Sequence, residues 1–206
     1  LFTRTMRDTV RAFGNMPGAN IRITDAFEIV AGGATQVKLT AINKPITRTS
    51  HNITVTIEGS ERPEEIVSFG GHFDSVEFSK GAHDNAAGSV INMEILRHFA
   101  ENKPKRTVQV MWYGAEEMGL LGSKAFIEQH PELVEKNIKF CFNFDMCGTV
   151  LGPNNIMITG DKNLEDFVEA FCREVGYSAR YRVGVHSSDS APFADKGIPG
   201  IGLSRG

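Results

Sequence analysis

The chain has 206 residues, of which 41% are hydrophobic and 23% are charged, so it can bury a substantial core. Its formal net charge of −3 includes no basic excess, which argues against nucleic acid or an anionic membrane as a partner. No uninterrupted apolar run approaches the roughly 18 to 20 residues that a membrane-spanning helix needs.

The first 48 residues differ in pattern from the rest of the chain. Residues 1–13 fit one amphipathic helix, which would stop near Gly14 and Pro17 because both residues disfavour a continuing helix. Charged residues within this segment are unlike a signal peptide, so the sequence indicates no compartment. Short runs with apolar residues predict strands at Ile21–Ile23, Gln36–Leu39 and Asn52–Ile57.

From residue 64 onward, apolar runs typical of strands alternate with helical patterns. Strands are predicted at Ile66–Phe69, Thr107–Tyr113, Ile138–Phe144, Ile156–Thr159 and Pro199–Leu203. Helices are predicted at Asn85–Glu101, Leu121–Gln129 and Leu164–Glu174. Asp84 stands where the N-cap of the first of these helices is expected. The alternation predicts an α/β fold with a central mixed, largely parallel sheet and helices on both faces.

Acidic residues and one histidine follow three of the predicted strands, and a further acidic residue precedes the first helix of this region. These residues are His72, Asp74, Asp84, Glu116, Glu117 and Asp145. In open α/β sheets, ligands bind beyond the carboxyl ends of the strands. Several carboxylates meeting there would repel one another unless a positive charge lay among them. Imidazole and carboxylate donors without a thiolate predict a site for zinc, manganese or cobalt.

The donors suffice for one zinc ion and for part of a second, if the two ions lie about 3.5–4 Å apart. In this hypothesis Asp84 bridges the two ions, and His72 and Asp145 complete the first. Glu117 is a ligand of the second ion. A bridging hydroxide would give the first ion the tetrahedral set that zinc usually has, whereas the second ion would lack one ligand.

Two acidic residues are left over for other roles. Glu116 neighbours a predicted ligand and is the candidate general base, which takes a proton from the metal-bound water and later gives it to the leaving amine. Asp74 lies two residues after His72, so in a strand both side chains would share one face. We therefore expect the Asp74 carboxylate to hold the second ring N–H of that histidine.

Four blocks of the sequence carry these residues: Gly71–Ser75 (GHFDS), Gly81–Gly88 (GAHDNAAG), Gly114–Ser123 (GAEEMGLLGS) and Asn143–Met146 (NFDM). Together, and in this order, they resemble the two-zinc aminopeptidase family of bacterial leucyl aminopeptidases and glutamate carboxypeptidases. The resemblance covers residues 64–205. It implies a zinc exopeptidase fold and an aminopeptidase that removes N-terminal residues from peptide substrates by means of a metal-bound hydroxide.

The resemblance also implies a role for each residue of the site. His72 and Asp145 would bind one zinc ion, Asp84 would bridge, Glu117 would bind the other ion, and Glu116 would be the base. It further implies a cis peptide bond between Asp84 and the asparagine that follows it.

The chain departs from the family pattern at both ends. The last zinc ligand of the family is a histidine in a loop beyond a strand like Gly197–Leu203, and the sequence ends at Gly206 before such a histidine. His186 is a weaker substitute for it. We therefore expect a fragment in which the C-terminal part is missing, the second zinc site is incomplete and activity is in doubt. Residues 1–48 are interpreted as the junction to an inserted domain, and residues 49–206 as the catalytic domain.

Four alternatives to an aminopeptidase are considered at this point. Carboxypeptidases and glutaminyl cyclases use a related site, and a binding module on the same scaffold would lack catalysis. The residues Gly202–Gly206 also fit the G-x-S-x-G elbow of serine hydrolases, but that elbow needs a helix, an acid and a histidine downstream.

Two further sequence features have plain explanations. Asn52-Ile53-Thr54 matches a glycosylation acceptor triplet, but such triplets arise often by chance. The three cysteines have no paired spacing, so they are expected to be reduced thiols rather than a disulfide framework.

Overall fold

The computed structural model describes residues 21–38, 40, 46–185 and 187–206. The chain divides into two compact units, Leu1–Arg48 and Thr49–Gly206. The predicted helix at residues 1–13 and the histidine at position 186 lie outside the described residues. The interpretation of the first unit as a junction to an inserted domain stays a prediction.

The first unit contains helix α2, Ile23–Ala31, where a strand was predicted to begin at Ile21. That prediction is wrong because an alternation of three residues is too short to outweigh local helix-forming contacts. The Arg22 guanidinium donates two hydrogen bonds to the Asp25 carboxylate at the start of the helix. Residues 36–38 are not in a strand either.

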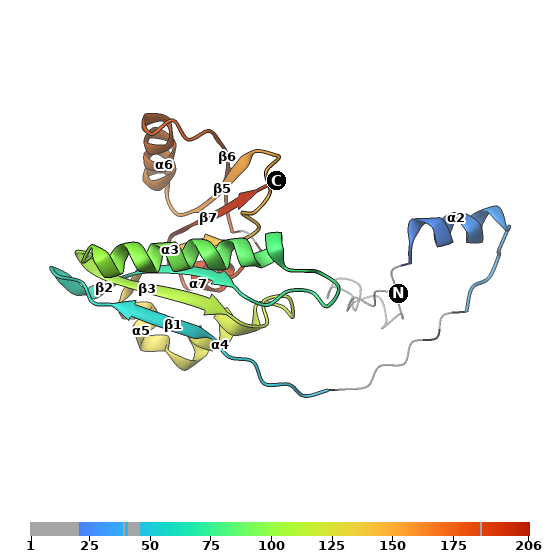
Figure 1. The fold of residues 1–206 in the computed structure, drawn as a ribbon, viewed down its shortest axis with the longest axis horizontal. Helices are drawn as coiled ribbons and strands as arrows, with labels where there is room; N and C mark the ends of the chain where they lie inside the picture. The colour runs from blue at the N-terminus through green and yellow to red at the C-terminus, as the bar shows by residue number, and fades with distance from the viewer. Residues whose placement is uncertain (1–20, 39, 41–45, 186) are drawn as a thin grey trace. The chain divides into compact units, whose positions relative to one another are not determined.

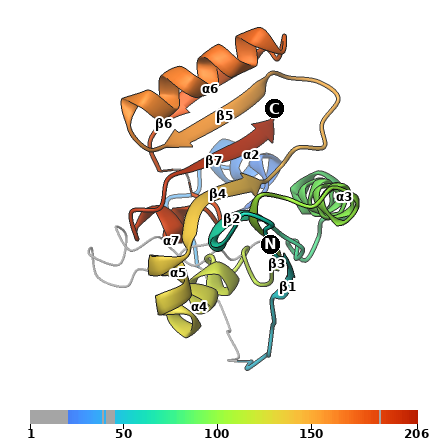
Figure 2. The same ribbon diagram turned by 90° about the vertical axis from the view of Figure 1, so that its left-hand side faces the viewer.

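The second unit is built on a seven-stranded sheet in the order β1-β3-β2-β4-β7-β5-β6 (Figure 2). The strands are β1 Ile53–Ile57, β2 Arg62–His72, β3 Arg106–Tyr113, β4 Ile138–Phe144, β5 Asn154–Thr159, β6 Ala179–Val183 and β7 Gly200–Arg205. The β1–β3 and β5–β7 pairs are antiparallel, and the other four pairs are parallel. The predicted mixed, largely parallel sheet is confirmed.

Helices cover both faces of this sheet, as predicted. The helices are α3 Ala87–Glu101, α4 Leu121–Gln129, α5 Pro131–Lys136, α6 Lys162–Glu174 and α7 Ala191–Ala194. Successive residues of a strand point to opposite faces, and almost every residue of β3 is buried. On one face, Val108, Val110 and Trp112 pack with side chains of α3, which lies along β2 and β3 (Figure 1). On the other face, Met111 and Tyr113 pack with residues of α4, α5 and α7.

The start of α3 differs from the predicted N-cap. A kinked, irregular turn, η1 Ala82–Ala86, precedes α3, and both Asp84 and Asn85 have non-helical dihedral angles within it. The cis peptide bond between Asp84 and Asn85 is present. Asn85 holds the helix start: its Oδ1 accepts a hydrogen bond from the Gly88 N–H at 3.0 Å, and its Nδ2 donates to the Phe144 carbonyl at 2.8 Å. The Asp84 carboxylate is therefore available to the edge of the sheet.

We expect Gly88→Ala to lower the free energy of unfolding by about 1 to 3 kcal/mol. A Cβ at this position would clash with the carbonyl oxygen of Phe144 and would lie 2.5 Å from Asn85 Oδ1. Helix propensity alone predicts the opposite sign, a gain of about 1 kcal/mol. Urea unfolding distinguishes these two expectations, with Ala100→Gly in the exposed last turn of α3 as the control. A stabilised Gly88→Ala variant would contradict the close packing.

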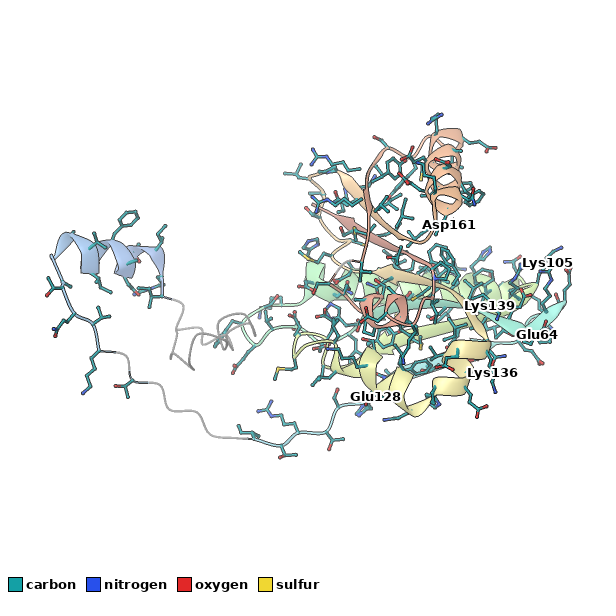
Figure 3. All side chains as sticks on the ribbon, turned by 180° about the vertical axis from the view of Figure 1, so that it is seen from behind. Glu64, Lys105, Glu128, Lys136, Lys139 and Asp161 are labelled. Atoms are coloured by element: carbon teal, nitrogen blue, oxygen red, sulfur yellow. The ribbon has the colours of Figure 1, made fainter. Side chains whose placement is uncertain are left out.

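Long charged side chains occupy the edge of the sheet where the parallel strands β2, β3 and β4 begin. Figure 3 shows Glu64, Lys105, Lys136 and Lys139 at this end of the unit. Two of the lysines form ion pairs of 3.0 and 3.1 Å with nearby glutamates. This edge is solvated and mixed in charge, unlike the opposite edge.

Two of the sequence features can be placed directly. Ser204 lies inside β7, where it pairs with Asn155 of β5, so the serine hydrolase elbow is wrong. Cys141, Cys147 and Cys172 are free thiols, as expected. Within the described residues, none of the helices has the length and apolar character needed to cross a membrane.

Candidate metal centre

The candidate site lies where β2, β3 and β4 end. His72 is the last residue of β2, and Asp145 directly follows β4. Because β2 pairs in parallel with both β3 and β4, all three strands end at the same edge. Glu116 and Glu117 lie in the loop between β3 and α4, and Asp84 lies in η1. Segments far apart in the sequence thus meet at one edge, as the sequence predicts.

Three possible ligand atoms face one another at this edge. The Nε2 atom of His72 lies 3.0 Å from Asp84 Oδ1 and 3.2 Å from Asp145 Oδ1. Ligand atoms of the three residues all lie within 4.8 Å of one another, so one metal ion could be held among them. Glu116 Oε2 lies 4.0 Å from the same nitrogen, and the His72 side chain is only 1% exposed.

The imidazole of His72 is oriented from its other side by Asp74. Its Nδ1 atom lies 3.0 Å from the main-chain oxygen of Asp74 and 3.5 Å from the carboxylate. The main-chain oxygen is therefore the closer partner, because Asp74 lies beyond the end of β2 and the same-face rule for strands no longer applies. This orientation turns Nε2 toward Asp84 and Asp145.

The carboxylate of Asp74 also binds the backbone of the loop after β3, a contact that was not predicted from the sequence. Its two oxygens accept hydrogen bonds from the backbone N–H groups of Glu116 at 3.0 Å and Glu117 at 3.2 Å. Burial raises the pKa of Asp74, but the hydrogen bonds from His72 and these two N–H groups outweigh burial and lower it. One carboxylate thus connects the histidine to the loop that carries both glutamates.

The electrostatic field of the site favours a bound positive charge. Burial lowers the pKa of His72, but its hydrogen bonds to Asp145 and Asp74 and the surrounding negative charges raise it to about 11. Burial raises the pKa of Glu116 to about 7; the charges of Asp189 and Asp145 act in the same direction, and that of His72 opposes them. Burial of Glu116 and the negative charges around His72 thus favour a proton on each group unless a cation takes its place.

The surroundings of Glu117 also favour a bound positive charge. Its pKa is raised first by burial and then by the negative charge of Asp84. Its Oε1 atom is buried and has no hydrogen-bond partner in the part of the chain that the structure describes. A buried carboxylate oxygen without a partner is costly unless a cation or a donor satisfies it.

A buried polar chain behind Asp145 was not predicted. The Nδ2 group of Asn143 donates to Ser188 Oγ at 2.7 Å, and the Ser188 hydroxyl donates to Asp145 Oδ2 at 2.7 Å. These two hydrogen bonds hold Asp145 in place, while the other oxygen of its carboxylate, Oδ1, faces His72. An asparagine within an apolar strand was the available signal for Asn143, whereas nothing local in the sequence indicates Ser188.

Asp189, which was given no role from the sequence, is fully buried. Among the described residues, neither of its carboxylate oxygens has a hydrogen-bond partner with good geometry, and the Ser123 hydroxyl lowers its pKa less than burial raises it. Burial raises its pKa from 3.8 to about 7. The carboxyl group is therefore kept in its neutral form to a higher pH than in the unfolded chain.

The Asp189 carboxyl group should make stability depend on pH. Because its pKa is 3.8 in the unfolded reference and about 7 in the fold, its contribution weakens as pH rises through this window and is lost above it. The side chain of Asp189→Asn cannot ionise. The free energy of unfolding of this variant minus that of the unsubstituted chain should therefore be roughly 2 kcal/mol larger at pH 8 than at pH 5. Urea unfolding at both pH values measures this, and an equal difference at the two would contradict it.

Comparison with known proteins gives one family and several relatives. Peptidase family M28 matches residues 52–206. Leupeptin-inactivating enzyme 1 of Streptomyces exfoliatus is 31% identical over 161 residues, which are 77% of this chain and 36% of that protein. Leucine aminopeptidase 2 of Arthroderma otae is 27% identical over 189 residues, which are 86% of this chain and 38% of that protein.

Solved structures show the same fold. A zinc aminopeptidase from Bacillus subtilis superposes with a TM-score of 0.66 at 27% identity, over 75% of this chain and 40% of that one. The chain thus spans less than half the length of these relatives.

Proposed function

Because this chain belongs to peptidase family M28, we propose that it carries the metal centre of a zinc-dependent exopeptidase, an aminopeptidase that releases N-terminal residues from peptides. The observation that carries the proposal is the meeting of one histidine nitrogen and two carboxylates, with a third carboxylate 4.0 Å away. The names of the relatives, leucine aminopeptidase and zinc aminopeptidase, support it.

His72, Asp84 and Asp145 are the proposed ligands of the first ion. Metal binding displaces the proton of His72. The neutral imidazole and two carboxylates then suit zinc better than they suit calcium or magnesium, which prefer oxygen donors alone. When bound, a divalent cation supplies the positive charge that polarises a carbonyl group and acidifies water. The hydrogen bonds from Ser188 and to the Asp74 carbonyl keep the donors in place.

We propose that Asp84 and Glu117 would hold a second ion. The support is the buried, unpartnered Oε1 of Glu117 and the influence of the Asp84 charge on its pKa. A pair of ions would give this oxygen a positive partner and would offset the repulsion between the two carboxylates.

Glu116 is the proposed proton carrier. Its Oε2 atom lies 4.0 Å from His72 Nε2, beside the ligand cluster. Burial raises its pKa to about 7 in the absence of a bound cation, so this carboxyl group can both accept and donate a proton. It would take the proton from the attacking water and deliver it to the nitrogen of the leaving amine. Asp74 fixes the backbone on which Glu116 stands.

A substrate panel tests the proposal. The zinc-loaded chain should hydrolyse aminoacyl-4-nitroanilides and dipeptides with a free N-terminus, and N-acetylation of the same substrates should abolish the reaction. Hydrolysis of N-blocked substrates at a C-terminal residue would instead identify a carboxypeptidase. Cyclisation of N-terminal glutamine would identify a glutaminyl cyclase. Zinc binding without turnover of any substrate would contradict aminopeptidase activity of this chain and would favour a binding module or an incomplete second metal site.

A further inference from the structure

The side chain of Asn52 joins the two ends of the loop that carries Glu116 and Glu117. Its Nδ2 group donates to the Gly122 carbonyl at 2.9 Å, and its Oδ1 atom accepts from the Gly114 N–H at 3.1 Å. Gly114 follows the last residue of β3, and Gly122 is the second residue of α4. One amide group therefore links the exit from the strand to the entry into the helix.

The three backbone segments approach too closely for larger groups to fit between them. A Cβ on Gly122 would clash with the Gly114 carbonyl and would lie 2.5 Å from Asn52 Oδ1. A Cβ on Gly114 would clash with Ser50 Oγ and would lie 2.6 Å from the carbonyl oxygen of His51. The position thus requires a short side chain that is at once a donor and an acceptor, and asparagine meets that requirement.

Other hydrogen bonds hold the middle of the loop, and the Lys124 side chain of α4 is one of the donors, to the Gly119 carbonyl at 2.9 Å. The Glu116 carbonyl accepts hydrogen bonds from the N–H groups of Gly119 and Leu120, both at 2.8 Å. The Asp74 carboxylate accepts from Glu116 and Glu117 on the side of the metal site. The bridge through Asn52 holds both ends of the loop and brings it onto the start of β1, the edge strand that pairs with β3.

We propose that Asn52 is a positioning residue, which fixes the loop of residues 115–121 so that Glu116 and Glu117 face His72. The proposal rests on the proposed function for its catalytic consequence. Asn52 was visible in the sequence only as the first residue of a glycosylation triplet. Both polar atoms of its side chain are engaged with the backbone, so its role is internal.

Two substitutions of Asn52 separate the effects of its two hydrogen bonds, to Gly114 and to Gly122. Asn52→Ala removes both hydrogen bonds, whereas Asn52→Asp keeps the acceptor for the Gly114 N–H and places a carboxylate against the Gly122 carbonyl. Two controls lie in β1: Thr54→Ala destroys the glycosylation triplet and keeps Asn52, and Val55→Ala loosens the strand without touching the bridge.

The first measurement is amide hydrogen exchange in the metal-loaded chain without substrate, which does not depend on activity. Exchange within residues 115–121 should become about 10-fold faster in Asn52→Ala, because two hydrogen bonds that restrain the loop are lost. The Gly114 N–H should stay protected in Asn52→Asp and lose protection in Asn52→Ala. Both β1 controls should leave the loop unchanged.

The second measurement is steady-state kinetics. The kcat of Asn52→Ala should fall on the order of 10- to 100-fold, as expected for a displaced catalytic group, with KM nearly unchanged. Thr54→Ala should keep the kcat of the unsubstituted chain. A loss of kcat in Thr54→Ala equal to that in Asn52→Ala would overturn the proposal in favour of a glycan.

Other outcomes also decide the proposal. Unchanged loop exchange in both Asn52 variants would overturn it, whatever the kinetics. Faster exchange with an unchanged kcat would overturn the link to Glu116. If the unsubstituted chain bound zinc but turned over no substrate, the proposed function would fail, and the exchange rates would still decide whether Asn52 positions the loop.

Discussion

Replacing Glu116 with glutamine should reduce the turnover of a peptide substrate by about 100- to 10,000-fold, the range expected when a general acid–base group is lost. Glutamine has nearly the same shape but cannot accept and return a proton at neutral pH. Because Glu116 is not one of the three residues that form the ligand cluster, the zinc content should be unchanged. Steady-state kinetics and elemental analysis of the same preparation measure both quantities.

A matched control for this substitution is Glu128→Gln, which removes one carboxylate from the end of α4. It makes the same chemical change at an exposed position and should leave turnover unchanged. If Glu116→Gln retained turnover, the proton carrier would have to be another group. If it lost zinc together with turnover, Glu116 would be acting as a ligand rather than as a base.

Zinc should stabilise the chain against unfolding, and His72→Ala should remove that stabilisation. A ligand that binds only the folded state adds about 2.7 kcal/mol at a free concentration 100 times its dissociation constant. Binding also relieves the repulsion between Asp84 and Asp145, whose oxygens both lie within 3.2 Å of the histidine nitrogen. Thermal unfolding with and without zinc, followed by the shift in Tm, measures this effect.

The control for this prediction is His98→Ala. His98 is exposed in the last turn of α3 and lies outside the ligand cluster, so this variant should keep the full zinc-dependent shift. An equal shift in the His72→Ala variant would place the stabilising ion elsewhere. A smaller but persistent shift would assign most of the binding to the carboxylates alone.

Much of the fold could be predicted because the core strands are strongly patterned. The second half of β3, from Val110 to Tyr113, is wholly apolar and is buried on both faces of the sheet. Helix α4 and strand β4 have the predicted bounds. β6 was missed because its sequence, ARYRV, is largely exposed at the edge of the sheet. In α2, local contacts outweighed a weak strand pattern.

The residues of the candidate site could be chosen from the sequence because parallel strands bring their carboxyl ends together. What joins those residues could not be predicted. The contacts of Ser188 with Asp145 and of Asn52 with Gly114 and Gly122 span 43 to 70 residues of sequence. Such contacts depend on the three-dimensional packing of loops, for which the sequence has no periodic signal. The capping role of Asn85 in place of Asp84 likewise follows from the local turn of η1.

The most direct test of the account is a crystal structure of the zinc-soaked chain with anomalous diffraction recorded at the zinc absorption edge. The account predicts an anomalous peak within bonding distance, about 2.0–2.2 Å, of His72 Nε2 and of a carboxylate oxygen from each of Asp84 and Asp145. Anomalous peaks confined to other positions, with these three side chains free of metal at saturating zinc, would contradict it.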